Sequence, residues 1–116
     1  MSPEITFERE DGVPIARLGG DVDAANAESI LKALLDHLDN RSPGVVMDLA
    51  RARYFDSAGM NMLFELFDQL KARRQRLCLV IPEGARVGRV MEIGGVTATI
   101  PCHQDLRPAV ELVSRG

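Results

Sequence analysis

Apolar positions in the first half of the chain follow two periods, one typical of strands and one typical of helices. Apolar and polar residues alternate over most of residues 5–9, residues 13–18 follow as a second strand, and Asp11-Gly12 between them is a turn signal. The chain is therefore predicted to open with a β-hairpin, which ends at Gly19-Gly20. A helix is predicted after Asp23, because the next apolar positions share one helical face at offsets of 3, 4, 7, 8 and 11. These positions are Ala27, Ile30, Leu31, Leu34, Leu35 and Leu38.

The second half of the chain continues this alternation. Short apolar runs at residues 45–49 and 77–81 suit strands that are covered on both faces, as in a parallel sheet. Helical periods predict a long helix at residues 57–74 and a short one at residues 85–93, which Gly94-Gly95 ends. Residues 96–100 are predicted to form the last strand, and Asp105 is expected to cap a final helix.

The order of these elements predicts an α/β fold. The order β-β-α-β-α-β-α-β-α gives a mixed sheet of about five strands with about four helices packed against it. A length of 116 residues and an apolar content of 46% suit one domain with a substantial core. Since no linker or repeat divides the sequence, we expect residues 1–116 to form a single domain.

Composition and charge narrow the classes of function. The net charge of −3 gives no reason to expect nucleic acid as a partner. No signal peptide opens the sequence, and no apolar run approaches the roughly 20 residues that span a bilayer. We therefore expect a cytoplasmic protein that does not insert into membranes. Cys78 and Cys102 form neither a disulfide framework nor a metal-binding spacing, and no cofactor is expected.

The sequence offers no recognisable set of catalytic residues. His37 is expected to face solvent, and His103 has no second pair of ligands at a metal-binding spacing. Neither histidine lies in a motif that would make it the base for a serine nucleophile. A Gly-x-Ser-x-Gly elbow and a phosphate-binding Gly-Lys-Ser/Thr element are both missing from the sequence. We therefore predict that the protein is not an enzyme.

Acidic residues and one serine gather at predicted junctions between strands and helices. They lie in Asp21-Val22-Asp23, at Asp48, and in Asp56-Ser57-Ala58-Gly59. Sites in α/β sheets gather where strands deliver the chain to helix starts, so Asp23 and Ser57 are expected at one edge if the second and third strands are neighbours. A helix start has free backbone N–H groups and a partial positive charge, which suit a hydroxyl or an added phosphate. Ser57 is thus the candidate switch residue.

A purely structural interpretation explains the same residues. Asp23 and Ser57 would be N-caps of the first and second helices, because Asp and Ser are preferred at that position. Asp48 would bond backbone N–H groups of the loop that follows it. Gly59 would be present because a side chain there would crowd the start of the helix.

The arrangement of these motifs over the whole chain resembles a known family. Asp56-Ser57-Ala58-Gly59, with Asp48-Leu49 eight residues earlier, and the segment Leu18-Gly19-Gly20-Asp21-Val22-Asp23-Ala24-Ala25 occur in the order found in the STAS domain of anti-sigma factor antagonists. The resemblance extends over residues 5–113. It implies a STAS-like fold and a protein–protein switch in a bacterial partner-switching pathway.

The resemblance also implies partners and site residues. In this family the serine that corresponds to Ser57 is phosphorylated by an anti-sigma factor that is itself a serine kinase. The unphosphorylated antagonist binds that anti-sigma factor and frees the sigma factor, and a serine phosphatase restores binding. Asp23 would take part in the kinase contact, and Asn61 is a departure from the family pattern that leaves the partner's identity open. The expected partner-binding residues are Asp21, Asp23, Asp56, Ser57, Ala58, Gly59 and Met60.

Other functions known for STAS-like domains stay open at this point. One is a cytoplasmic subunit of a lipid-transport ABC complex, where the domain would be a structural partner of an ATPase and would need no phosphoserine. Another is a scaffold in a larger stress-signalling assembly. A weak homodimer is also left open.

Overall fold

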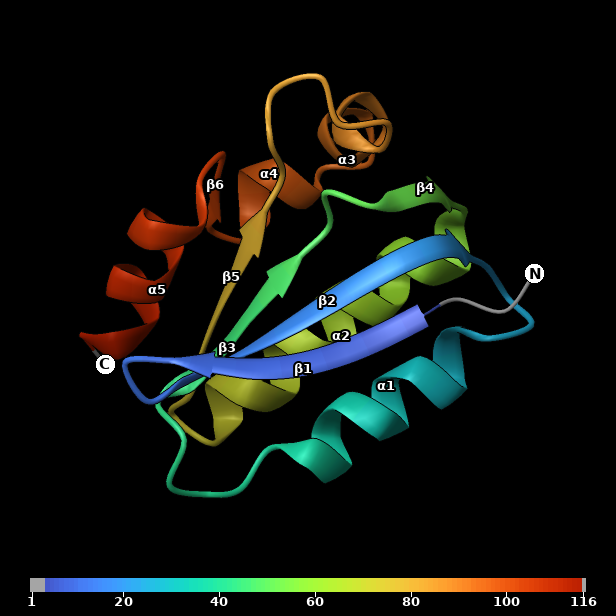
Figure 1. The fold of residues 1–116 in the computed structure, drawn as a ribbon. Coiled ribbons are helices and arrows are strands. Elements are labelled where there is room, and N and C mark those ends of the chain that lie inside the picture. Colours follow the sequence, from blue (N-terminus) through green and yellow to red (C-terminus); the bar gives the residue numbers. More distant parts are fainter. Residues whose placement is uncertain (1–3, 116) are drawn as a thin grey trace.

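A mixed β-sheet organises residues 4–115, which are the residues that this computed structural model describes (Figure 1). The strand order is β1-β2-β3-β5-β6, and β4 pairs with the far end of β2. β1 and β2 form an antiparallel hairpin, and every other pairing is parallel. The strands are β1 (Glu4–Glu10), β2 (Val13–Val22), β3 (Gly44–Asp48), β4 (Ala52–Phe55), β5 (Arg76–Val80) and β6 (Cys102–His103).

Helices cover both faces of this sheet and create two separate cores. The larger core lies between the sheet and helices α1 (Ala27–His37) and α2 (Ser57–Ala72), and it includes residues of the short helices α3 (Gly88–Ile93) and α4 (Val96–Thr99). The smaller core lies under α5 (Leu106–Ser114), on the other face. Cys78 is fully buried in the smaller core, and this burial raises the pKa of its thiol to about 12. None of the helices within residues 4–115 combines the length and the apolar character that crossing a bilayer requires.

The predicted α/β fold with a mixed sheet is confirmed, and the opening hairpin and the long helix after residue 56 lie where the sequence pattern placed them. β2, however, does not end at Gly19-Gly20. It continues to Val22. Its pairing with β3 ends at Arg17, its pairing with β4 begins at Gly20, and the register shifts between Gly20 and Asp21. Gly20 has a φ of 86°, which a glycine adopts without steric cost, so the glycine pair redirects the strand instead of ending it.

The prediction of a last strand at residues 96–100 is wrong. This segment forms the helical turn α4, in which the N–H of Ile100 donates to the carbonyl of Val96 at 2.8 Å. Val96 and Ile100 are buried while residues 97–99 are exposed, which is the spacing of one helical turn. The final strand is instead β6, so the described residues form six strands and five helices where about five and about four were expected.

The start of α2 packs closely against the end of β2. The N–H of Asp56 donates to the carbonyl of Val22 at 3.1 Å. Gly59, in the first turn of α2, is buried, and a Cβ added there would lie 2.8 Å from Cδ2 of Phe55 and 3.0 Å from Cγ1 of Val22. The interpretation that a side chain at Gly59 would crowd the helix start is therefore confirmed.

We expect Gly59→Ala to lower the free energy of unfolding by about 1–3 kcal/mol, because the added methyl group forces Phe55 or Val22 to move in a packed core. Alanine is the better helix former, so the loss would be a packing effect. Gly88→Ala is the matched control, since its Cβ would meet only Cγ2 of Ile81 at 3.8 Å. Urea unfolding of both variants tests this, and equal stabilities would contradict it.

Candidate functional site

The carboxylate of Asp56 joins two segments that are far apart in the sequence. Its Oδ1 accepts a hydrogen bond from the N–H of Gly59 at 2.9 Å, which makes Asp56 the N-cap of α2. Its Oδ2 accepts one from the N–H of Ala24 at 3.2 Å, in the loop between β2 and α1. A single side chain thus satisfies a free N–H at the helix start and fixes the neighbouring loop beside it.

Ser57 is the first residue of α2 and is exposed. The interpretation in which Ser57 caps the helix is wrong, because Asp56 occupies that position one residue earlier. Within residues 4–115, the Ser57 hydroxyl has no hydrogen-bond partner. The Ser57 hydroxyl therefore lies at a helix start, next to a carboxylate, and makes no hydrogen bond that stabilises the described structure.

The two aspartates of the loop after β2 have different partners. Asp23 does not cap α1, since Asn26 holds the N-cap position; the Asp23 carboxylate instead accepts the N–H of Ala25 at 3.0 Å in a local turn. Asn26 closes that turn, as its Oδ1 accepts the N–H of Asp23 at 3.0 Å. The carboxylate of Asp21 pairs with Nε of Arg53 on β4 at 3.5 Å.

These contacts bring two of the three predicted motifs together, Asp21-Val22-Asp23 and Asp56-Ser57-Ala58-Gly59, as expected. β2 and β3 are neighbouring parallel strands, and the contact between Asp56 and Ala24 sets the loop that carries Asp23 beside the start of α2. Figure 1 shows the same junction, with the end of β2, β4 and the first turns of α2 in one region. Arg53 and Asn26 were not identified from the sequence. Arg53 reaches Asp21 only because β4 pairs with β2, and Asn26 bonds to Asp23 only through the geometry of the turn.

The remaining predicted site residues differ in accessibility. Ala58 is half-buried and lines a groove between α1 and α2. Gly59 is buried, so it contributes to the site through packing and is not exposed to a partner. Met60 is half-buried and reaches α3, since a Cβ added at Gly94 would lie against its sulfur.

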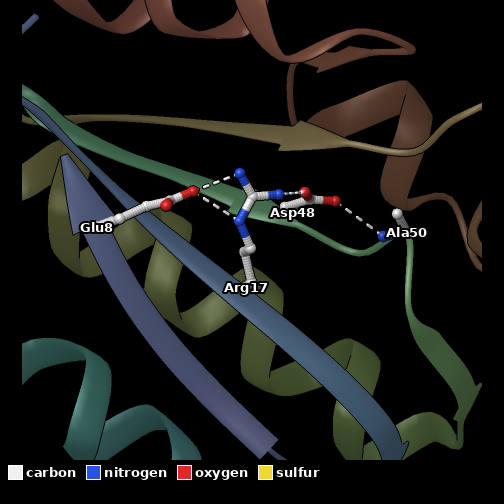
Figure 2. Close-up of polar contacts among 4 residues, drawn as sticks. All are labelled: Glu8, Arg17, Asp48 and Ala50. Carbon is white, nitrogen blue, oxygen red and sulfur yellow. Dashed lines mark hydrogen bonds and ion pairs between the residues drawn. The ribbon is translucent and has the colours of Figure 1, made fainter. Parts of the chain in front are cut away.

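Asp48 belongs to a different cluster, on the face of the sheet on which α5 packs. Figure 2 shows Glu8, Arg17 and Asp48 in a row across β1, β2 and β3, with Asp48 also bonded to the loop. Asp48 is only 8% exposed; it pairs with Arg17, and its Oδ1 accepts the N–H of Ala50 at 2.9 Å. The predicted bond to the following loop is therefore confirmed.

This cluster does not reach the start of α2. Arg17 pairs across the sheet with Asp48, whereas Val22 lies five residues further along β2, roughly 16 Å at about 3.3 Å per residue. Hydrogen bonding to Glu8 and the charge of Asp48 raise the pKa of Arg17, so the guanidinium stays charged. Arg17 could not be identified from the sequence, because its role depends on which strands flank β2.

Asp56→Ala should lower the free energy of unfolding by about 1–2 kcal/mol, because the N–H groups of Gly59 and Ala24 lose their acceptor. Ser57→Ala is the matched control and should change it by less than about 0.5 kcal/mol. Thermal and urea unfolding of the two neighbouring variants would decide this. A Ser57→Ala variant as unstable as Asp56→Ala would show that the serine hydroxyl has a structural role after all.

For the cluster of Figure 2, Asp48→Ala is expected to cost about 1–3 kcal/mol of stability, since the N–H of Ala50 and the guanidinium of Arg17 lose their shared partner. Glu8→Gln should cost no more than about 0.5 kcal/mol, because Glu8 is half exposed and its ion pair is screened. Unfolding in urea at low and high salt measures both. Similar losses for the two variants would contradict the assignment of Asp48 as the buried anchor.

Comparison with known proteins agrees with this architecture. A family model described as the STAS domain matches residues 4–109. BtrV of Bordetella bronchiseptica, a protein assigned as an anti-sigma factor antagonist, is 34% identical over 100 residues, which are 84% of this chain and 84% of BtrV.

Solved structures show the same fold. An anti-sigma factor antagonist from Mycobacterium paratuberculosis matches with a TM-score of 0.84 and 23% identity, over 97% of this chain and 95% of that one. The anti-sigma factor antagonist SpoIIAA in its unphosphorylated form matches with a TM-score of 0.63 and 18% identity, over 97% of this chain and 99% of that one. From the family match and the identity to BtrV, this chain belongs to the STAS domain family, the family of the anti-sigma factor antagonists that it resembles.

Proposed function

We propose that this protein is an anti-sigma factor antagonist and works as a phosphorylation-controlled protein–protein switch, with Ser57 as the phosphate acceptor. The observation that carries the proposal is the exposed Ser57 hydroxyl at the start of α2, left free because Asp56 caps the helix. A kinase needs an accessible hydroxyl, and a group without a structural task can be esterified without unfolding the site.

The charge around Ser57 explains how one phosphate would change partner choice. Phosphoserine adds about −1.5 to −2 charges at neutral pH. The helix start favours an anion, so the phosphate would be tolerated within the folded domain. On a docking surface that already holds the carboxylates of Asp23 and Asp56, the added charge acts on the partner instead, through repulsion and through the cost of desolvating a dianion.

The partners follow from the same proposal. The unphosphorylated protein binds an anti-sigma factor that is a serine kinase, phosphorylation releases it, and a serine phosphatase restores binding in the cytoplasm. The protein itself then needs no catalytic group, because the partners perform both reactions. Support comes from the assignment of BtrV as an anti-sigma factor antagonist and from the description of SpoIIAA in an unphosphorylated form, both in proteins of this fold.

The docking surface in this proposal surrounds Ser57. Asp56 and Ala58 are next to Ser57 in the chain, and the bond from the Ala24 N–H to Asp56 holds the loop of Asp23 beside the start of α2. Asp21 and Met60 would form the margins, where Asp21 pairs with Arg53 and Met60 reaches the end of α3. Gly59 contributes by allowing the close approach of α2 to β2. Asn61, exposed on the next turn, lines the groove between α1 and α2 and is a candidate for setting partner preference.

Incubation with the anti-sigma factor kinase and ATP, followed by mass spectrometry, tests the acceptor site. We expect one phosphate on the wild type and on Ser29→Ala, which removes another exposed serine, and none on Ser57→Ala. Phosphorylated protein should bind the kinase at least about 100-fold more weakly, which corresponds to about 2.7 kcal/mol. Full phosphorylation of Ser57→Ala, or unchanged affinity after phosphorylation of Ser57, would reject the proposal.

A further inference from the structure

Two large apolar side chains are exposed within residues 4–115, and both belong to elements that adjoin the start of α2. Ile93, the last residue of α3, is 75% exposed, and Tyr54 on β4 is 53% exposed. Tyr54 lies three residues before Ser57, and its strand partner is Asp21. Apolar groups scattered singly over a surface are ordinary, whereas groups that gather at one place mark an interaction site.

The packing of α3 does not explain why residue 93 is apolar. Met91 is fully buried in the larger core, and the half-buried Val90 packs against it. Ile93 follows Met91 by two residues, or about 200° around the helix axis, so it lies on the opposite side. Arg89, one turn earlier on that side, is exposed as well. A polar side chain at position 93 would suit the folded domain equally well, so the isoleucine needs another reason.

Met60 connects Ile93 to the proposed switch. Met60 lies one turn after Ser57 in α2, about 4.5 Å further along the helix axis. A Cβ added at Gly94, the residue after Ile93, would lie 3.3 Å from Cε of Met60. The end of α3 therefore lies against the first turn of α2. A partner surface of ordinary size measures about 800 Å², or about 30 Å across, so a partner that covers Ser57 would also reach Ile93.

We propose that Ile93 and Met60 form an apolar contact with the anti-sigma factor kinase, and that this contact sets how strongly phosphate on Ser57 weakens binding. The inference rests on the proposed function and names the apolar part of its docking surface. The kinase would place an apolar side chain over Ile93, because burying apolar surface against apolar surface is what stabilises the centre of an interface.

The exclusion of water links the apolar contact to the phosphate. A partner that packs over Ile93 and Met60 removes water from the neighbouring Ser57. The neutral hydroxyl loses little by this, whereas a phosphate dianion loses the hydration that stabilises its charge. In a contact that stays wet, the same phosphate would remain hydrated and its charge would be screened. The effect of the phosphate on affinity therefore depends on the side chain at position 93.

A second copy of this chain fits the same surface less well. A symmetric contact would place the same patch of both copies face to face. The carboxylates of Asp23 and Asp56 from the two copies would then approach one another. Like charges that meet across an interface weaken it, so the surface favours a partner of different sequence.

The experiment measures the dissociation constants of wild type and Ile93→Asn for the kinase, each without phosphate and with phosphate on Ser57. ADP replaces ATP in these measurements, so that no phosphate is transferred. Ile93→Asn should weaken binding of the unphosphorylated protein at least about tenfold, because it removes a buried isoleucine from the interface. Phosphate should weaken binding of the wild type at least about 100-fold and of the variant no more than about tenfold.

Two control variants separate this contact from general effects. Ile93→Val keeps most of the apolar surface and should bind within about fivefold of the wild type. Ala72→Asn, which changes an exposed residue about 22 Å from Ser57 along α2, should bind as the wild type does. Because Ile93 is exposed, Ile93→Asn should also leave the midpoint of urea unfolding unchanged.

The outcomes distinguish this inference from the proposed function. Unchanged kinase affinity for Ile93→Asn, or an equal loss of affinity in both phosphorylation states, would overturn the inference and leave Ser57 as the acceptor. A wild type that does not bind the kinase, or whose affinity does not respond to phosphate, would reject the proposed function and this inference with it. Sedimentation of the protein alone tests the other occupant. Dimers that Ile93→Asn dissociates would assign Ile93 to a contact between copies and contradict the proposal.

Discussion

The bonds between the Asp56 carboxylate and two backbone N–H groups hold together the end of this domain that carries Ser57. One bond starts α2, and the other holds the loop that leads into α1. The Asp56 N–H completes the junction through the carbonyl of Val22, at the last residue of β2. Without this carboxylate, the free N–H groups at the start of α2 and in the loop would face one another with no acceptor between them.

This junction also needs a close backbone approach, which Gly59 permits. The first turn of α2 lies against Val22 and Phe55, and among residues 57–60 only Ser57 is exposed. The acidic groups at the site are thus mostly engaged in local geometry: Asp23 in its turn, Asp21 with Arg53 and Asp56 as the cap. They set the electrostatic character of the surface while maintaining its shape.

The sequence predicted those parts of the fold that depend on local periodicity. The hairpin, α1 and α2 follow from apolar spacing, and the meeting of Asp23 with the start of α2 followed from the order of the elements. β4 could not be predicted in this way, since its four residues have no repeating pattern and it is a strand only because β2 continues past Gly20. The segment with Val96 and Ile100 was misassigned because two apolar residues four apart fit both a strand end and one helical turn.

The geometry at the start of α2 was predicted in outline, but the capping residue was not predicted correctly. Ser57 and Asp56 are adjacent, both are good capping residues, and a sequence cannot place a helix boundary to within one position. The different roles of Asp23 and Asp48, which both lie near strand ends, were harder still to predict. Asp48 and Asp23 look alike in the sequence, but the pairing of Arg17 with Asp48 shows that Asp48 belongs to the ion-pair cluster on the sheet (Figure 2).

The separation of tasks between neighbouring residues has an evolutionary consequence. Asp56 caps α2, and Gly59 allows α2 to approach β2 closely. The identity of residue 57 is therefore not under selection for foldability. A lineage could lose the hydroxyl by a single substitution and keep an intact scaffold, available for recruitment to constitutive assemblies that need no covalent modification.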